Sequence, residues 1–164
     1  ISGSWRKINK VLEKDIRDNV REIINKGDGI ITGGALNVDS IAADEALKLD
    51  PTAKTIKVFL PTTLEIFASH YHKRAEERVI TKQQAKDLIT QLTKIKEINP
   101  PSLVENRKNK VLNKETYYER NSAIVEVADE LIAFHVNESM GTKDTINKAH
   151  KKGIPVKVFT YNIE

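Results

Sequence analysis

The sequence predicts an α/β fold: a Rossmann-like three-layer sandwich with a mostly parallel, five-stranded sheet and a helical insertion. Three observations support this. Short β-branched apolar runs alternate with stretches in which apolar residues recur every three or four positions. Glycine-containing turns follow three of the runs, and 164 residues suit one domain. A single domain over residues 1–164 is therefore expected, with the strand order 3-2-1-4-5.

The five expected strands are short and end close to turns. The sequence begins at Ile1-Ser2, which resembles the end of a strand, so a short N-terminal piece is expected to be missing. The other four strands are expected at 29–32, 56–60, 131–134 and 156–159. Parallel strands bring their carboxyl ends to one edge of a sheet, where ligands of such folds bind.

Two helices are expected between the first three strands. One covers 6–26 and ends before Gly27, and the other covers 35–49 with Asn37 as its N-cap. Roughly seventy residues then separate the third strand from the fourth, more than one crossover helix needs, so a helical insertion is expected at about 73–112. Within it, Thr81-Lys82-Gln83-Gln84 matches a capping box that opens a helix.

Composition excludes several classes of protein. The chain has no cysteine, which rules out disulfides and thiolate metal sites, and its four histidines do not match a zinc pattern, so no metal is expected. No apolar run approaches the ~20 residues that span a bilayer, so no membrane partner and a cytoplasmic location are expected. The net charge of +4 suits an anionic ligand without requiring one.

Three glycine-containing turns carry the functional prediction. Between a strand and a helix, such a turn exposes backbone N–H groups at the positive end of the helix dipole, where a phosphate can bind. Because the turns follow strands one, two and four, they are expected to converge at one sheet edge. The complete GxxxxGK[ST] and GxGxxG signatures are absent, so ATP hydrolysis is not expected. The residues of the expected phosphate cradle are Gly3, Ser4, Thr32, Gly33, Gly34, Ala35, Ser139, Gly141 and Thr142.

The segments ITGGALNVDSIAADEAL (31–47), ERNSAIVEVADELIAF (119–134) and SMGTKDTINKAHKKGIPVKVF (139–159) resemble the SLOG superfamily. This superfamily joins the Rossmann domain of the DNA-processing protein A (DprA/Smf) proteins to the LOG, "lysine decarboxylase-like", phosphoribohydrolases. The resemblance is closer to the DprA-like branch. It implies a Rossmann-like domain whose glycine turns hold a nucleotide or a nucleotide-derived ligand, often in a dimer.

The resemblance also implies site residues. Arg120-Asn121 would start a helix near the ligand, where Arg120 could pair with a phosphate. Asp39 could accept hydrogen bonds from ribose hydroxyls or from amides of the glycine turn. DprA proteins typically carry a histidine where Ala43 stands, and this departure puts a transferred DNA-processing role in doubt.

The LOG branch implies a hydrolase only if its carboxylate is present. LOG hydrolases carry a glutamate at the position of Thr145, and Asp144 lies one residue early, about 100° away on a helix. Glu119 and Asp39 are then the candidate catalytic carboxylates.

Three functions follow from these observations. The first is a nucleotide-binding module, a sensor or carrier of a phosphorylated ligand. The second is a phosphoribohydrolase, N-glycosidase or transferase acting on nucleoside monophosphates. The third is a single-stranded DNA-binding, DprA-like protein. Basic residues of the central segment favour the third, but acids alternate with them, and stacking aromatics there are limited to Tyr71, Tyr117 and Tyr118. The basic residues are Lys73, Arg74, Lys82, Lys86, Lys94, Lys96, Arg107, Lys108, Lys110 and Lys114.

Overall fold

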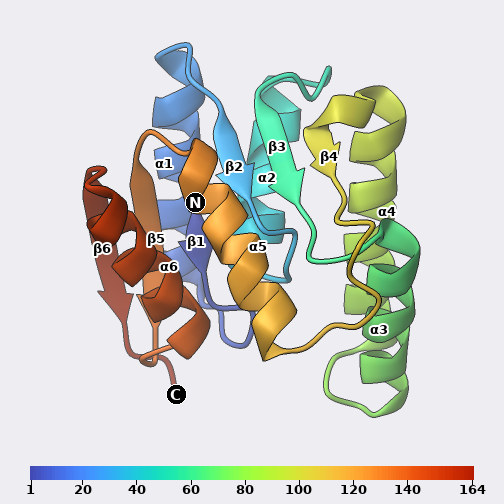
Figure 1. The fold of residues 1–164 in the computed structure, drawn as a ribbon. Coiled ribbons are helices and arrows are strands. Elements are labelled where there is room, and N and C mark those ends of the chain that lie inside the picture. The colour runs from blue at the N-terminus through green and yellow to red at the C-terminus, as the bar shows by residue number, and fades with distance from the viewer.

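A computed structural model describes residues 1–164 and confirms the α/β class, with a parallel sheet between two layers of helices (Figure 1). The helices are α1 (Lys10–Asn25), α2 (Val38–Leu49), α3 (Leu64–Glu76), α4 (Lys82–Ile98), α5 (Lys114–Val127) and α6 (Met140–Lys152). The strands are β1 (Ser2–Gly3), β2 (Ile30–Thr32), β3 (Ile56–Phe59), β4 (Leu103–Val104), β5 (Leu131–Val136) and β6 (Val156–Tyr161). A short 3₁₀ helix, η1 (Pro100–Ser102), precedes β4.

The strands form two parallel ladders that meet in the middle of the sheet. One ladder has the order β2-β3-β4 and the other the order β1-β5-β6. The amine nitrogen of Ile1 donates to the carbonyl oxygen of Ile31 at 2.9 Å, which brings β1 beside β2. The combined order is β4-β3-β2-β1-β5-β6, as Figure 1 shows. The five predicted strands therefore lie in the predicted order.

The sixth strand, β4, is not among the five predicted strands. It has only two residues, and it pairs with β3 through Val58 opposite Leu103 and Phe59 opposite Val104. A two-residue strand shows no period in sequence, and the preceding Pro100-Pro101 marks a turn. Pairing with β3 turns this short segment into an edge strand.

The helices pack in pairs against the sheet. In Figure 1, α5 and α6 cover one face and α1 and α2 the other, while α4 lies beside β4 and packs against α3. The main core includes the fully buried side chains of Phe67, Phe134, Leu12, Ile16 and Leu92. A smaller cluster lies between β5 and the α5–α6 pair. None of the helices has the length and apolar character needed to cross a bilayer.

Side-chain caps set where several helices begin. Helix α1 was expected from residue 6 but begins at Lys10, because the Asn9 side chain accepts from the Leu12 amide at 2.8 Å. The predicted capping box of α4 is confirmed: the Thr81 hydroxyl accepts from the Gln84 amide, and the Gln84 side chain accepts from the Thr81 amide. Asn37 precedes α2 as expected, but its side chain donates to the Trp5 carbonyl instead of capping the helix.

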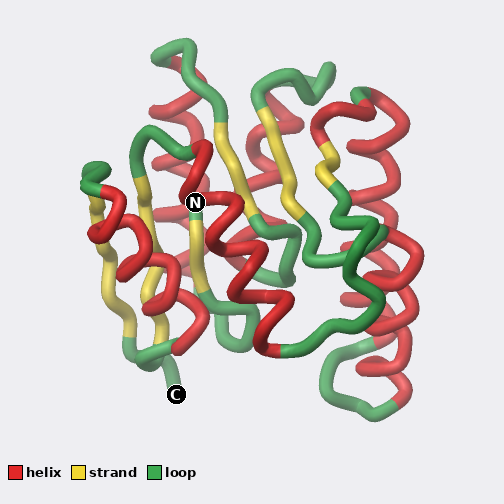
Figure 2. The backbone as a smooth tube through the Cα atoms, viewed as in Figure 1, coloured by secondary structure: helices red, strands yellow, loops and turns green.

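The segment expected as a helical insertion at about 73–112 contributes the edge strand β4 to the sheet. It contains the last turn of α3, all of α4, η1 and β4, and α3 itself begins earlier, at Leu64. A loop over residues 105–113 then returns along the edge of the molecule to α5 (Figure 2). This loop contains most of the basic stretch 107–114.

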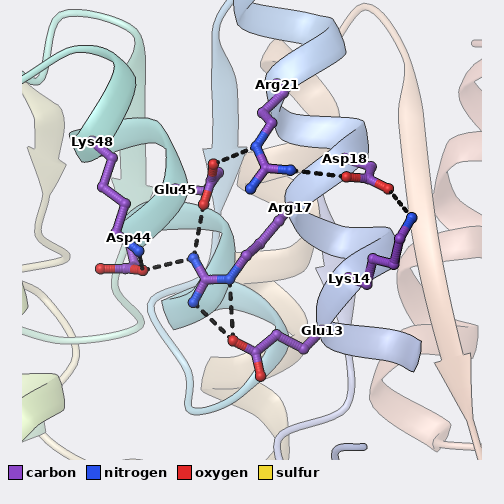
Figure 3. A network of polar contacts seen from close by, with 8 residues as sticks. All are labelled: Glu13, Lys14, Arg17, Asp18, Arg21, Asp44, Glu45 and Lys48. Atoms are coloured by element: carbon purple, nitrogen blue, oxygen red, sulfur yellow. Dashed lines mark hydrogen bonds and ion pairs between the residues drawn. The ribbon is translucent and has the colours of Figure 1, made fainter. Parts of the chain in front are cut away.

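Helices α1 and α2 are joined by a network of ion pairs (Figure 3). The Glu45 side chain, only 5% exposed, accepts from Arg17 at 2.9 Å and from Arg21 at 2.7 Å. Arg17 also pairs with Asp44 at 2.7 Å and with Glu13 at 2.9 Å. Burial alone would raise the pKa of Glu45, but the hydrogen bonds from the two arginines outweigh it and lower that pKa.

The Asp50 carboxylate, at the end of α2, organises the turn that leads to β3. It accepts from the Thr52 hydroxyl and amide and from the Thr55 hydroxyl and amide. The Thr52 hydroxyl, followed by the Thr55 groups, lowers the pKa of Asp50 to about 2. The ionised carboxylate therefore stabilises the folded chain above the ordinary pKa of an aspartate, and this contribution is lost as the pH falls toward 2.

We expect Asp50→Ala to lower the free energy of unfolding at pH 7 by about 1 kcal/mol, a modest value because the residue is only half-buried. Urea denaturation at pH 7 and at pH 3 measures the effect. The difference between wild type and variant should shrink at the lower pH. An equal difference at both pH values would contradict the assignment.

Candidate functional site

A cavity of about 670 Å³ opens where β1, β2 and β5 end. The loops after these strands form part of its wall, and the start of α5 closes another side. The structure brings ten of the predicted site residues to this one cavity, from segments far apart in the chain. They are Gly3, Ser4, Gly33, Ala35, Asp39, Arg120, Asn121, Ser139, Gly141 and Thr142.

Three predicted residues do not line the cavity. Thr32 is fully buried, and its hydroxyl oxygen has no hydrogen-bond partner. Gly34 has a φ of 71° and packs so closely that a Cβ there would lie 2.7 Å from the Leu60 side chain. Glu119 faces the 105–113 loop, where its carboxylate accepts from Asn106 at 3.1 Å and from Asn109 at 3.2 Å. The structure thus places Glu119 as an anchor of the loop.

Gly33 and Arg120 are in direct contact. The Arg120 Nη1 atom donates to the Gly33 carbonyl oxygen, and its Nε donates to the Asn121 side chain at 3.1 Å. A Cβ on Gly33 would lie 2.2 Å from Nη1, so the absence of a side chain there makes room for the guanidinium. The Arg120 Nη2 atom makes no hydrogen bond to the protein and is available to an anion in the cavity.

Asp39 acts on the glycine turn. Its carboxylate, in a residue only 5% exposed, accepts from the Ala35 amide at 3.1 Å. Burial raises the pKa of Asp39, while the positive charge of Arg120 and the Ala35 amide oppose the rise. Of the two hydrogen-bonding roles considered for Asp39, the structure shows the bond to an amide of the turn.

The beginning of α6 forms the second wall. Four helices have a side-chain N-cap, from Asn9, Thr63, Thr81 and Asn113, whereas α6 has none. The Ser139 hydroxyl instead accepts from the Thr142 hydroxyl at 3.3 Å. The first amides of a helix have no partner inside the helix, so those of α6 are available at the cavity wall.

Thr145 and Asp144, the positions compared with the glutamate of the LOG hydrolases, make hydrogen bonds within the protein. The Thr145 hydroxyl donates to the Gly141 carbonyl at 3.2 Å and is buried. The Asp144 carboxylate accepts from Asn121 at 3.1 Å and from Lys148 at 2.7 Å. Neither residue lines the cavity, and no three His, Asp or Glu side chains are grouped as around a metal ion.

The charged side chains of the cavity lining are mostly cationic, and several large aromatic residues line the cavity with them. Its side chains include five lysines and arginines, four large aromatics and two carboxylates: Arg6, Lys7, Arg74, Lys114 and Arg120; Trp5, Tyr71, Tyr117 and Tyr118; Asp39 and Glu138. The guanidinium of Arg120 lies 5.5 Å from the Tyr117 ring centre. Burial and the nearby charge of Arg74 lower the pKa of His70, another lining residue, which favours its neutral form.

Trp5, Arg6 and Lys7 line the cavity but are not among the predicted site residues. In the sequence they stand directly after the Gly3-Ser4 turn, and Arg6 and Lys7 fall within the range expected for the first helix. The signal that identifies them is their position: they follow a strand at its carboxyl end, in a loop and before a helix cap.

The chain is similar to known DNA-processing proteins. The family model for DNA recombination-mediator protein A matches residues 1–164. Among solved structures, that of DNA processing protein A from Helicobacter pylori, which describes its single-stranded DNA binding mode, superposes with a TM-score of 0.66. The two sequences are 22% identical, and the match covers 95% of this chain but only 61% of that chain. No curated protein sequence matches this chain significantly.

Proposed function

The chain belongs to the DNA recombination-mediator protein A family, and from that premise we propose that its cavity binds single-stranded DNA. The observation that carries the proposal is the cavity lining, in which five cationic side chains outnumber two carboxylates and four aromatic residues are also present. Proteins that bind single strands combine these two elements: cations that follow the phosphates and aromatic rings on which bases stack.

The phosphate contacts are proposed at two places. Arg120 offers its free Nη2 beside Gly33, and the first amides of α6 offer backbone donors near Gly141. The lysines at positions 7 and 114 add positive charge around them. Both places bind a phosphate group, and a phosphate is present in a nucleic acid as well as in a free nucleotide.

A free nucleoside phosphate is the second candidate ligand. A Cβ on Gly141 would meet no atom within 4 Å, so the start of α6 leaves space for a ligand group. A cavity of about 670 Å³ falls within the usual range for small-molecule sites. Under this alternative the domain is a sensor or carrier of the nucleotide. The homodimer and the single domain over 1–164, both expected from the sequence, remain predictions.

Binding of a fluorescein-labelled oligo(dT) across a salt series tests the proposal. We expect the affinity to fall steeply with salt, because bound cations on DNA are released when lysines and arginines contact phosphates. An unlabelled oligo(dT) should displace the labelled strand at far lower concentration than dTMP. Displacement by dTMP at equal or lower concentration would favour the free-nucleotide alternative, and absence of any binding would reject the strand proposal.

Lys114→Glu and Lys82→Glu form a matched pair for the same measurement. Both lysines are exposed first residues of helices, α5 and α4, but only Lys114 lines the cavity. We expect Lys114→Glu to weaken strand binding several-fold and to reduce the salt slope by about one. Lys82→Glu, which changes the net charge equally, should leave both nearly unchanged. Equal effects from the two variants would mean that only overall charge matters.

A further inference from the structure

Trp5 is exposed at the cavity wall in a way that needs an explanation. It is 36% exposed, and it is the only aromatic among the large hydrophobic residues that the structure leaves exposed. Tryptophan usually buries its large apolar surface in a core or an interface. Here the ring lies in the loop between β1 and α1 and lines the cavity.

The backbone around Trp5 is fixed although its ring is exposed. The Trp5 carbonyl accepts a hydrogen bond from the Asn37 side chain, at the start of α2. The hydroxyl of Ser4, a residue only 5% exposed, accepts from the Arg6 amide at 3.3 Å. The loop is therefore held on both sides of the ring, which lowers the ordering cost of placing a partner against it.

Arg6 gives the ring a cationic neighbour. Its guanidinium carbon lies 5.3 Å from the centre of the Trp5 ring, within the range of a cation–π contact. The pair presents an aromatic surface next to a positive charge. A nucleotide has the complementary arrangement, a flat base joined through a sugar to a negative phosphate.

We propose that Trp5 is a stacking platform for a base of the bound strand, with Arg6 contacting the adjoining phosphate. This inference rests on the proposed function and deepens it, because it assigns base contact to the β1–α1 loop and phosphate contact to Arg120 and α6. Stacking on a tryptophan face requires no base-specific hydrogen bond, so this contact tolerates any sequence.

The chain contains a single tryptophan, so emission excited at a wavelength that tyrosine does not absorb reports on this residue alone. We expect oligo(dT) to change the Trp5 emission with the same midpoint as the anisotropy of a labelled strand. An abasic strand of the same length should still bind through its phosphates but change the emission far less. Trp5→Ala should weaken oligo(dT) binding about tenfold, and Trp5→Phe should retain most of the affinity.

Ile8→Ala is the matched control, because Ile8 is also 36% exposed and follows in the same loop but does not line the cavity. The slope of affinity against salt should be the same in Trp5→Ala and wild type, since stacking releases no counterions. Circular dichroism confirms that each variant is folded. If wild type binds oligo(dT) and Trp5→Ala binds it equally well, the stacking assignment is overturned while the proposed function stands. If wild type binds no strand at all, both fall.

Discussion

Gly33→Asp is expected to reduce the affinity for single-stranded DNA at least about 100-fold, a loss of about 3 kcal/mol. The new side chain would occupy the position of the Arg120 guanidinium, because even a Cβ there would lie 2.2 Å from Nη1. Its carboxylate would also neutralise Arg120 and repel the phosphates of the strand. Anisotropy titration of a labelled oligo(dT) measures the loss.

Two alanine variants separate steric from electrostatic effects. Gly33→Ala displaces Arg120 without adding a charge, so it should weaken binding by about tenfold. Gly141→Ala adds a methyl group beside the α6 amides, where no protein atom lies within 4 Å, so it should leave folding unchanged but weaken binding by taking the space proposed for a phosphate. Thermal unfolding should change little in either, because the atom displaced at Gly33 is the end of a flexible side chain. Full binding by Gly33→Asp would remove Arg120 from the proposed site.

Glu45→Ala is expected to lower the free energy of unfolding by about 2–3 kcal/mol at pH 7. The carboxylate is 5% exposed and joins Arg17 and Arg21 between α1 and α2, as Figure 3 shows. Its loss leaves Arg17, whose side chain is 19% exposed, with Glu13 and Asp44 only. Urea denaturation followed by circular dichroism measures the change.

Glu45→Gln and Glu22→Ala are the controls for this prediction. The glutamine keeps the volume and an acceptor, so the difference between Glu45→Gln and Glu45→Ala separates packing from charge. Because the pKa of Glu45 is lowered in the folded chain, the charge contribution is complete above the ordinary glutamate pKa. The gap between wild type and Glu45→Gln should close as the pH falls below it. Glu22→Ala removes an exposed ion pair with Lys26 and should have no measurable effect.

Local patterns in the sequence predict the fold well where an element is long. The apolar spacing of α1 and α4 and the β-branched runs of β2, β3, β5 and β6 suffice to identify these elements and their order. The start of α1 and the strand β4 could not be placed in this way. The first depends on a single hydrogen bond from the Leu12 amide to the Asn9 side chain, and the second exists only because two residues pair with the edge of β3.

The site residues that lie in glycine turns could be predicted from the sequence. Those whose position depends on tertiary contacts could not. Position after a strand is enough to bring Gly33, Gly141 and Ser4 to one cavity. By contrast, Glu119 stands beside Arg120 in the sequence, yet successive helical residues point in different directions, and its carboxylate holds Asn106 and Asn109. Trp5 carries no motif, and its exposure at the cavity is visible only in the folded chain.

The division of the sheet into two ladders has a consequence for the order of folding. The β2-β3-β4 half comes from one continuous stretch, residues 30–104, and can assemble while the chain is still being synthesised. The other half must wait, because β1 pairs with β5, Ser2 lying opposite Ala133. Closing so long a loop is slow. The cavity, whose walls come from both ends of the chain, therefore forms in the last step, and a partly synthesised chain has no complete binding site.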